Sequence, residues 1–226
     1  MSEGYQIISI KERVWAIQDD TVRMYLLNGK TASVLIDTGY GKSDLAAAVR
    51  PYASGKLRVI NTHCHHDHIS GNRQFHYFYM HERDRDEISQ ACPEDAVIET
   101  VKDGELITAG EISLEVIEIP GHTPGSIALL DRKDRLLFSA DSFAKEFPIY
   151  MQFPGQDLKS YGDSIQKMMA LSACFDRICP CHGEPVIERE YMGKTLNCVE
   201  KILSLGQIPE HTPEYVMRHD GVTILY

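Results

Sequence analysis

The sequence predicts one α+β domain in which helices cover β-sheets and polar loops gather along a sheet edge. Short apolar runs with strand periodicity fill residues 6–36, and helical spacing recurs at 42–53, 157–173 and 188–205. Of the 226 residues, 43% are hydrophobic and 25% are charged. This length and composition are typical of one sizeable globular domain, so we expect residues 1–226 to form a single domain.

The first third of the chain alternates strands with a turn and a helix. Strand-like runs occur at 7–10, 14–17, 24–27, 32–36 and 57–61. Asn28-Gly29 is typical of a hairpin turn. The stretch 42–53 places Leu45, Ala48 and Val49 on one helical face, so a helix is expected there.

The remaining two thirds repeat this alternation. We predict strands at 76–80, 112–119, 127–130, 135–138, 176–179 and 222–225, and helices at 82–90, 157–173 and 188–205. Residues 93–110 are mixed and turn-rich, with Asp103-Gly104 as a turn. The hairpin 127–138 is expected to end at Asp141, so that His63, His122, Asp141 and His182 would each follow an apolar strand.

The densest chemistry lies in Thr62–His68, whose seven residues include four histidines and Asp67. Ordinary core packing does not require so many imidazoles in one loop. Neutral imidazole and carboxylate are the usual ligands of catalytic zinc and related divalent ions. The segment therefore predicts a metal site.

The spacing within this segment separates its ligands into two pairs. His63 and His65 are two residues apart, so on an extended backbone both side chains point to one side and reach one ion. Asp67 and His68 are adjacent, where the loop gives way to a helix, and cannot share that geometry. A second ion is the natural interpretation, and a single tetrahedral ion is the leaner alternative.

The segment His63-x-His65-x-Asp67-His68 resembles the HxHxDH signature of the metallo-β-lactamase superfamily. Four further elements match that family in the same order. They are Leu-Ile-Asp-Thr-Gly at 35–39, Gly-His-Thr-Pro-Gly-Ser at 121–126, Ser-Ala-Asp-Ser at 139–142 and Pro-Cys-His-Gly at 180–183. The match spans roughly two thirds of the chain, from 37 to 183.

The resemblance implies a two-metal site whose ligands carry over position by position. The first ion would take His63, His65 and His122, the second Asp67, His68 and His182, and Asp141 would bridge the two. Asp37 matches a structural position, so we expect it to order the metal loop by hydrogen bonds rather than to bind metal. The implied cofactors are two divalent ions, with zinc favoured and iron or manganese as alternatives.

The resemblance also implies the fold and the reaction. The fold would be a four-layer αββα sandwich of two mixed β-sheets with outer helices. The reaction would be a glyoxalase II-like hydrolysis, in which a metal-bridging hydroxide attacks a small ester-like substrate. Asp67 and Asp141 would be the catalytic residues, with positioning of the hydroxide as their first role and acceptance of a proton from the water that forms it as the alternative.

The substrate class stays open at this point, with a thioester or a lactone expected first. One alternative is a phosphodiesterase. Another is a non-hydrolytic metal-binding module that senses oxygen or redox state. The aromatic-rich segment 143–154 forms either core, a subunit contact or an apolar wall over the substrate, and it supplies Phe147 and Tyr150 as candidate substrate-binding residues.

Net charge and composition limit the classes of molecule that the protein is expected to bind. The net charge of −10 argues against a nucleic-acid partner and leaves a small-molecule substrate, with a homodimer as an open alternative. No basic region followed by an apolar run, and no membrane-spanning apolar stretch, is present, so we expect a cytoplasmic protein that does not bind a membrane. Six cysteines are then expected as free thiols, and two of them, Cys64 and Cys181, flank predicted ligands.

Overall fold

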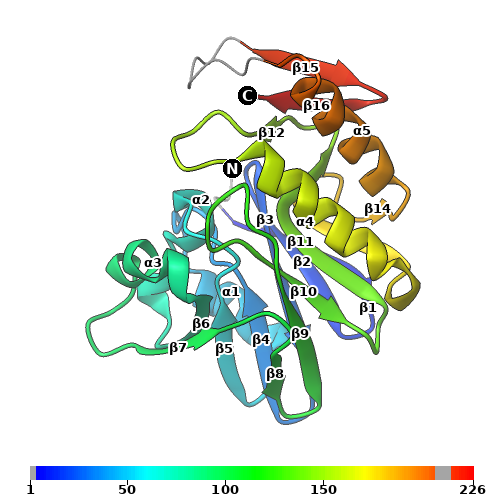
Figure 1. Cartoon of the computed structure of the whole chain (residues 1–226). Helices are drawn as coiled ribbons and strands as arrows, with labels where there is room; N and C mark the ends of the chain where they lie inside the picture. The colour runs from blue at the N-terminus through cyan, green and yellow to red at the C-terminus, as the bar shows by residue number, and fades with distance from the viewer. Residues whose placement is uncertain (1–3, 207–214) are drawn as a thin grey trace. The chain divides into compact units, whose positions relative to one another are not determined.

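The computed structural model describes residues 4–206 and 215–226 (Figure 1). The chain divides into two compact units, Met1–Val116 and Ile117–Tyr226. The single domain expected over residues 1–226 stays a prediction. Among the described residues, no helix combines the length and the apolar character that crossing a membrane requires.

A seven-stranded sheet forms the centre of the first unit, and its strands lie in chain order from β1 to β7. The strands are β1 Gln6–Lys11, β2 Val14–Asp19, β3 Val22–Asn28, β4 Ala32–Ile36, β5 Lys56–Ile60, β6 Tyr77–His81 and β7 Val97–Val101. Pairing is antiparallel from β1 to β4 and parallel from β4 to β7. The β3–β4 turn forms at Asn28-Gly29, as the sequence predicts, with the Gly29 N–H donating to the Ala32 carbonyl.

Short helices follow the parallel strands of this unit. They are α1 Leu45–Val49, α2 His66–Ile69 and α3 Arg85–Ala91, with single 3-10 turns η1 Arg50–Tyr52, η2 Asn72–Gln74 and η3 Glu82–Asp84. Leu45 and Ile88 bury their side chains in the same core as Phe78. In the register of β4 and β5, Ile36 pairs with Ile60, so the segments that leave these two strands begin at the same sheet edge.

The predicted turn at Asp103-Gly104 forms, with the Glu105 N–H donating to the Lys102 carbonyl at 3.1 Å, but two strands that were not predicted flank it. These are β7 and β8 Leu106–Ala109, and β8 pairs with β9 Ile112–Glu118 as a hairpin. β7 is an edge strand, and three of its residues, Val97, Glu99 and Thr100, are exposed. An exposed edge needs few apolar residues, so this strand carries a weak hydrophobic signal.

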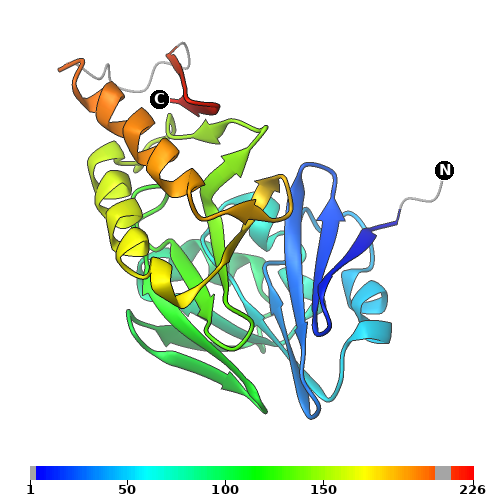
Figure 2. The same ribbon diagram turned by 90° about the vertical axis from the view of Figure 1, so that its right-hand side faces the viewer.

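The second unit combines a larger sheet, a small sheet and two helices. The larger sheet contains β10 Ile127–Asp131, β11 Leu136–Lys145, β13 Arg177–Gly183 and β14 Ile187–Glu188. The small sheet orders β12 Ile149–Tyr150, β16 Val222–Leu225 and β15 Val216–His219. The helices α4 Leu158–Ala170 and α5 Tyr191–Leu203 pack side by side, and the 3-10 turn η4 is Ser172–Cys174 (Figures 1 and 2).

Helix α4 shows how the sequence directs this packing. The Asp157 carboxylate caps it by accepting from the Lys159 N–H at 2.8 Å and the Ser160 N–H at 3.3 Å. Tyr161, Ile165 and Met168 recur at helical spacing and enter the core of the unit. Two predictions need correction here: the last long helix begins at Tyr191 rather than at residue 188, and β15 was not predicted.

Candidate functional site

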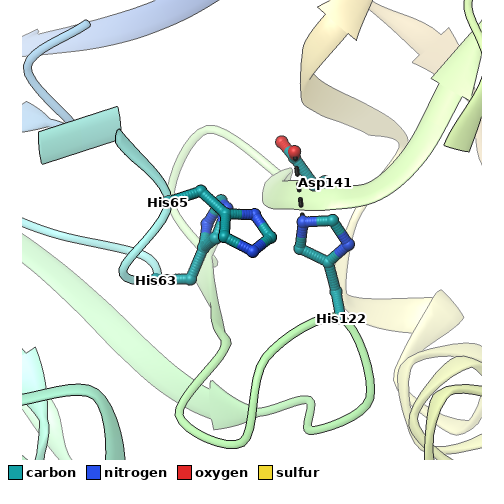
Figure 3. A group of neighbouring side chains, drawn as sticks. All are labelled: His63, His65, His122 and Asp141. Carbon is teal, nitrogen blue, oxygen red and sulfur yellow. Dashed lines mark ion pairs between the residues drawn. The ribbon is translucent and has the colours of Figure 1, made fainter. Parts of the chain in front are cut away.

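The predicted ligands of the first unit, His63, His65, Asp67 and His68, form the N-terminal donor group, which lies just after β5. The rings of His63 and His65 are 4.8 Å apart and nearly perpendicular, and both leave the same loop (Figure 3). The rings of His63 and His68 are 4.0 Å apart. Asp67 Oδ2 lies 3.7 Å from His68 Nε2. The structure thus brings all four residues together within one unit.

A buried carboxylate, Asp37, fixes part of this group. Its Oδ1 accepts the Thr62 N–H at 2.8 Å, and its Oδ2 accepts the Thr62 hydroxyl at 2.7 Å. The same Oδ2 lies 2.8 Å from His68 Nδ1. An ionised carboxylate only accepts hydrogen bonds, so Nδ1 of His68 carries the proton and Nε2 is left unprotonated, in the form that binds a metal.

The backbone around α2 is held from both sides. The backbone N–H of Thr38 donates to the His68 carbonyl at 2.8 Å, and the Thr38 hydroxyl donates to Asn72 Oδ1 at 2.8 Å. The side-chain amides of Asn61 and Asn72 bond each other at 2.9 and 3.2 Å. These bonds tie the loop to β4 and to η2, so the imidazoles project from a fixed frame.

The predicted ligands of the second unit, His122, Asp141 and His182, form the C-terminal donor group. Two imidazoles approach one carboxylate oxygen: His122 Nε2 lies 3.4 Å and His182 Nε2 lies 3.3 Å from Asp141 Oδ2. Figure 3 shows His122 turned toward Asp141. The three side chains are 4%, 11% and 9% exposed, so they are shielded but still reachable from solvent.

The strand context of this group differs from the prediction. Asp141 lies within β11 and His182 within β13, so neither follows the end of its strand. The pairing of β11 with β13 shifts register on both sides of Ala140, which has a φ of 49°. Such bulges redirect a side chain without ending the strand. No residue pattern indicates this bulge, because the apolar run simply stops before Asp141.

His122 is oriented by groups that the sequence did not indicate. Its Nδ1 lies 3.0 Å from the Tyr150 carbonyl and 3.3 Å from Gln156 Nε2. The carbonyl is nearer and can only accept, and the Gln156 NH2 has that carbonyl as its own acceptor, so Nδ1 carries the proton and Nε2 is presented for a metal. Gln156 Nε2 donates to the same carbonyl at 3.1 Å. Gln156 Oε1 accepts the Phe153 N–H at 2.8 Å, which fixes the direction of the amide. No motif marks Gln156, so sequence reasoning missed it.

The predicted substrate-binding residues lie beside the C-terminal donor group. The Phe147 ring stacks on the His182 ring with centroids 4.9 Å apart and planes 10° apart. The Tyr150 ring lies 6.1 Å from the Phe147 ring and 6.1 Å from the Phe153 ring. Through its carbonyl, Tyr150 also positions His122, a role distinct from the substrate contact expected of its side chain. The substrate roles of Phe147 and Tyr150 stay predictions.

A glycine allows the His122 loop to pass close to α4. Gly121 has a φ of +135°, and a Cβ added to it would lie 2.5 Å from the Tyr161 Cα. Its carbonyl accepts the Asp157 N–H at 2.9 Å. Only glycine combines this backbone conformation with this approach.

Gly121→Ala is therefore expected to lower the free energy of unfolding by about 2 kcal/mol, because α4 must move away from the loop. Chemical denaturation measures this change. The control is Gly193→Ala in α5, where an added Cβ meets nothing within 4 Å. That replacement is expected to stabilise the helix by up to about 1 kcal/mol. Equal unfolding free energies for Gly121→Ala and the unmodified chain would contradict the packing argument.

The cysteine beside the predicted ligands is a poor thiolate. Burial raises the pKa of the Cys64 thiol to about 12, and the Asp84 charge adds to this rise. The Cys64 N–H donates to Asp84 Oδ2 at 3.1 Å. None of the six cysteines, all of them described, forms a disulfide.

Comparison with known proteins finds one matching family model and several curated relatives. The family model of the metallo-beta-lactamase superfamily matches residues 18–182. Human acyl-coenzyme A thioesterase MBLAC2 is 26% identical over 182 residues, covering 62% of this chain and 64% of that protein. A hydroxyacylglutathione hydrolase of Francisella tularensis is 29% identical over 150 residues, covering 65% of this chain and 57% of that protein. Each of these two matches covers less than two thirds of the relative.

A solved structure resembles the chain over most of its length. The metallo-beta-lactamase from Pontibacter korlensis superposes with a TM-score of 0.75 at 22% identity, covering 87% of this chain and 99% of that chain. This likeness confirms the predicted fold class, an α+β protein with the metallo-β-lactamase fold. The family model covers well over half of the sequence. The chain belongs to the metallo-β-lactamase superfamily.

Proposed function

We propose that this chain is a metal-dependent hydrolase that cleaves a small thioester. The main observation behind this proposal is that hydrogen bonds fix the tautomer of two predicted histidine ligands. His68 and His122 each engage Nδ1 with an acceptor and so present Nε2 without a proton. Neutral imidazoles beside carboxylates suit zinc and similar divalent ions.

The proposal gives two ions to the two donor groups. His63, His65 and His122 would hold one ion, Asp67, His68 and His182 would hold the other, and Asp141 would be shared by both. Within the second unit, the approach of two imidazoles to one Asp141 oxygen supports a shared carboxylate. Zinc is the first choice of metal, and iron and manganese are the alternatives. When bound, such ions lower the pKa of water and polarise a carbonyl oxygen.

The protein's own groups then have distinct tasks. Asp141 and Asp67 position the attacking water and accept its proton, and their side chains are 11% and 15% exposed. Asp37 keeps His68 in the tautomer that leaves Nε2 unprotonated. Phe147 covers one face of His182 and provides an apolar surface for the substrate.

The relatives favour a thioester over the other ester-like substrates. MBLAC2 is named as an acyl-coenzyme A thioesterase, and the Francisella protein as a hydroxyacylglutathione hydrolase. Both names describe the cleavage of a thioester.

A hydrolysis panel on the full chain, with metal content measured on the same samples, tests the proposal. The panel contains a glutathione thioester, an acyl-coenzyme A, an acyl-homoserine lactone, a chromogenic β-lactam and a bis-aryl phosphate. We expect two bound divalent ions per chain and turnover of a thioester that is lost on chelation and restored by zinc. The control is His76→Asn, whose side chain is 69% exposed and outside both donor groups. Turnover of the phosphate alone, or coloured bound iron without any turnover, would overturn the proposal.

A further inference from the structure

The small sheet of the second unit has two different faces. In its register Arg218 pairs with Thr223, and Met217 pairs with Ile224. Directly opposite residues of an antiparallel pair share a face. Val222 and Ile224 are buried in the core of the unit, with Met217 packed against that core. Arg218 and Thr223 therefore lie on the other face.

A pocket of about 370 Å³ lies on that other face. Its walls include Arg218, Thr223 and Leu225 from the sheet, and Glu146, Phe147 and Pro148 from the segment between β11 and β12. β12 pairs in parallel with β16, Tyr150 beside Leu225, which holds that segment next to the sheet (Figure 1). The pocket belongs wholly to the second unit.

Phe147 links this pocket to the C-terminal donor group. The same ring that lines the pocket stacks on His182 with centroids 4.9 Å apart. A molecule that extends past the edge of Phe147 can therefore occupy the pocket and still reach the predicted metal ligands.

The polar groups of the pocket indicate the charge of its ligand. Arg218 is exposed, and within 4–206 and 215–226 no side chain forms an ion pair or a hydrogen bond with it. A guanidinium offers five N–H donors and pairs with carboxylate or phosphate in a bidentate manner. Glu146 also lines the pocket, and its negative charge would repel an anion bound there. Removing the charge of Arg218 should therefore weaken anion binding, and removing the charge of Glu146 should strengthen it.

We propose that this pocket binds the anionic end of the thiol part of the substrate, and that Arg218 determines specificity for it. The inference rests on the proposed thioesterase function. The shared chemistry is an anion, either a carboxylate such as those of glutathione or a phosphate such as those of coenzyme A.

Three thioesters with the same acetyl group separate these sources: S-acetylglutathione, acetyl-coenzyme A and the uncharged S-acetyl-N-acetylcysteamine. For Arg218→Gln in the metal-loaded full chain, we expect KM for a charged thioester to rise about tenfold. KM for the uncharged thioester and kcat should change little. An effect on the glutathione ester alone identifies a carboxylate, and an effect on the coenzyme A ester alone identifies a phosphate.

Glu146→Gln is the matched control, since it removes a charge of opposite sign from the same pocket. It should lower KM for the charged thioester and leave the uncharged one unchanged. An equal rise in KM for charged and uncharged thioesters with Arg218→Gln would overturn the inference, as would no change for either charged one.

If the proposed thioesterase function is wrong, the unmodified chain will cleave none of the three thioesters. The pocket is then tested by measuring the equilibrium binding of glutathione and of coenzyme A to the unmodified chain and to Arg218→Gln. Binding of either that weakens about tenfold in Arg218→Gln supports the pocket. Absent binding, or equal binding by the two proteins, rejects it.

Discussion

Asp141→Ala is expected to lower kcat for thioester hydrolysis by about a thousandfold, a barrier increase of several kcal/mol. In the proposed arrangement this carboxylate serves both ions, and its Oδ2 lies within 3.4 Å of two imidazole nitrogens. No neighbouring carboxylate of the C-terminal donor group can replace it. Bound metal should fall below two ions per chain, as measured by atomic emission on dialysed protein.

The same replacement should leave the fold intact. Asp141 lies at a bulge in β11, where β11 and β13 already shift register, so pairing of the strands does not depend on its side chain. Asp163→Ala in α4 is a suitable control, because Asp163 is exposed and forms a surface ion pair with the exposed Lys159. Full turnover with two bound ions in Asp141→Ala would refute the bridging role, whereas an unfolded variant would show a structural one.

The parts of this arrangement that follow from local sequence were predictable. His63 and His65 lie close together because alternate residues of an extended segment share a side. The turn at Asn28-Gly29 and the cap of α4 at Asp157 are likewise short-range effects of residue type. The ligands that lie far apart in the sequence, His122, Asp141 and His182, were predicted from the family resemblance, because residue spacing alone cannot show that they come together.

What escaped prediction depends on contacts between distant segments. The bulge at Ala140 arises from how β11 pairs with β13, some forty residues later in the chain. Gln156 supports His122 through the carbonyl of Tyr150, and a backbone acceptor leaves no trace in the sequence. Arg218 faces its pocket only because β15 pairs with β16. In each case, tertiary pairing decides where a side chain points.

Asp37→Asn is expected to weaken zinc binding 10- to 100-fold, the usual effect of losing the partner that orients a ligand. Asp37 has a φ of 61°, a conformation that Asn tolerates as well as Asp, so the backbone should be preserved. The amide oxygen can still accept the Thr62 N–H. The amide NH2 then faces His68 Nδ1, and two donors cannot share one hydrogen bond.

The imidazole of His68 can satisfy that NH2 only by moving its proton to Nε2, the nitrogen that the proposal assigns to the metal. Nitrogen-15 spectra of the metal-free protein should therefore show an Nδ1 proton on His68 in the unmodified chain and an Nε2 proton in the variant. Asp44→Asn provides the control, since Asp44 caps α1 by accepting the Ala47 N–H at 2.8 Å, away from His68, and Asn caps equally well. Unchanged zinc affinity together with an unchanged His68 tautomer would show that Asp37 merely fills space. Weaker binding with the unchanged tautomer would place its effect in the geometry of the loop instead.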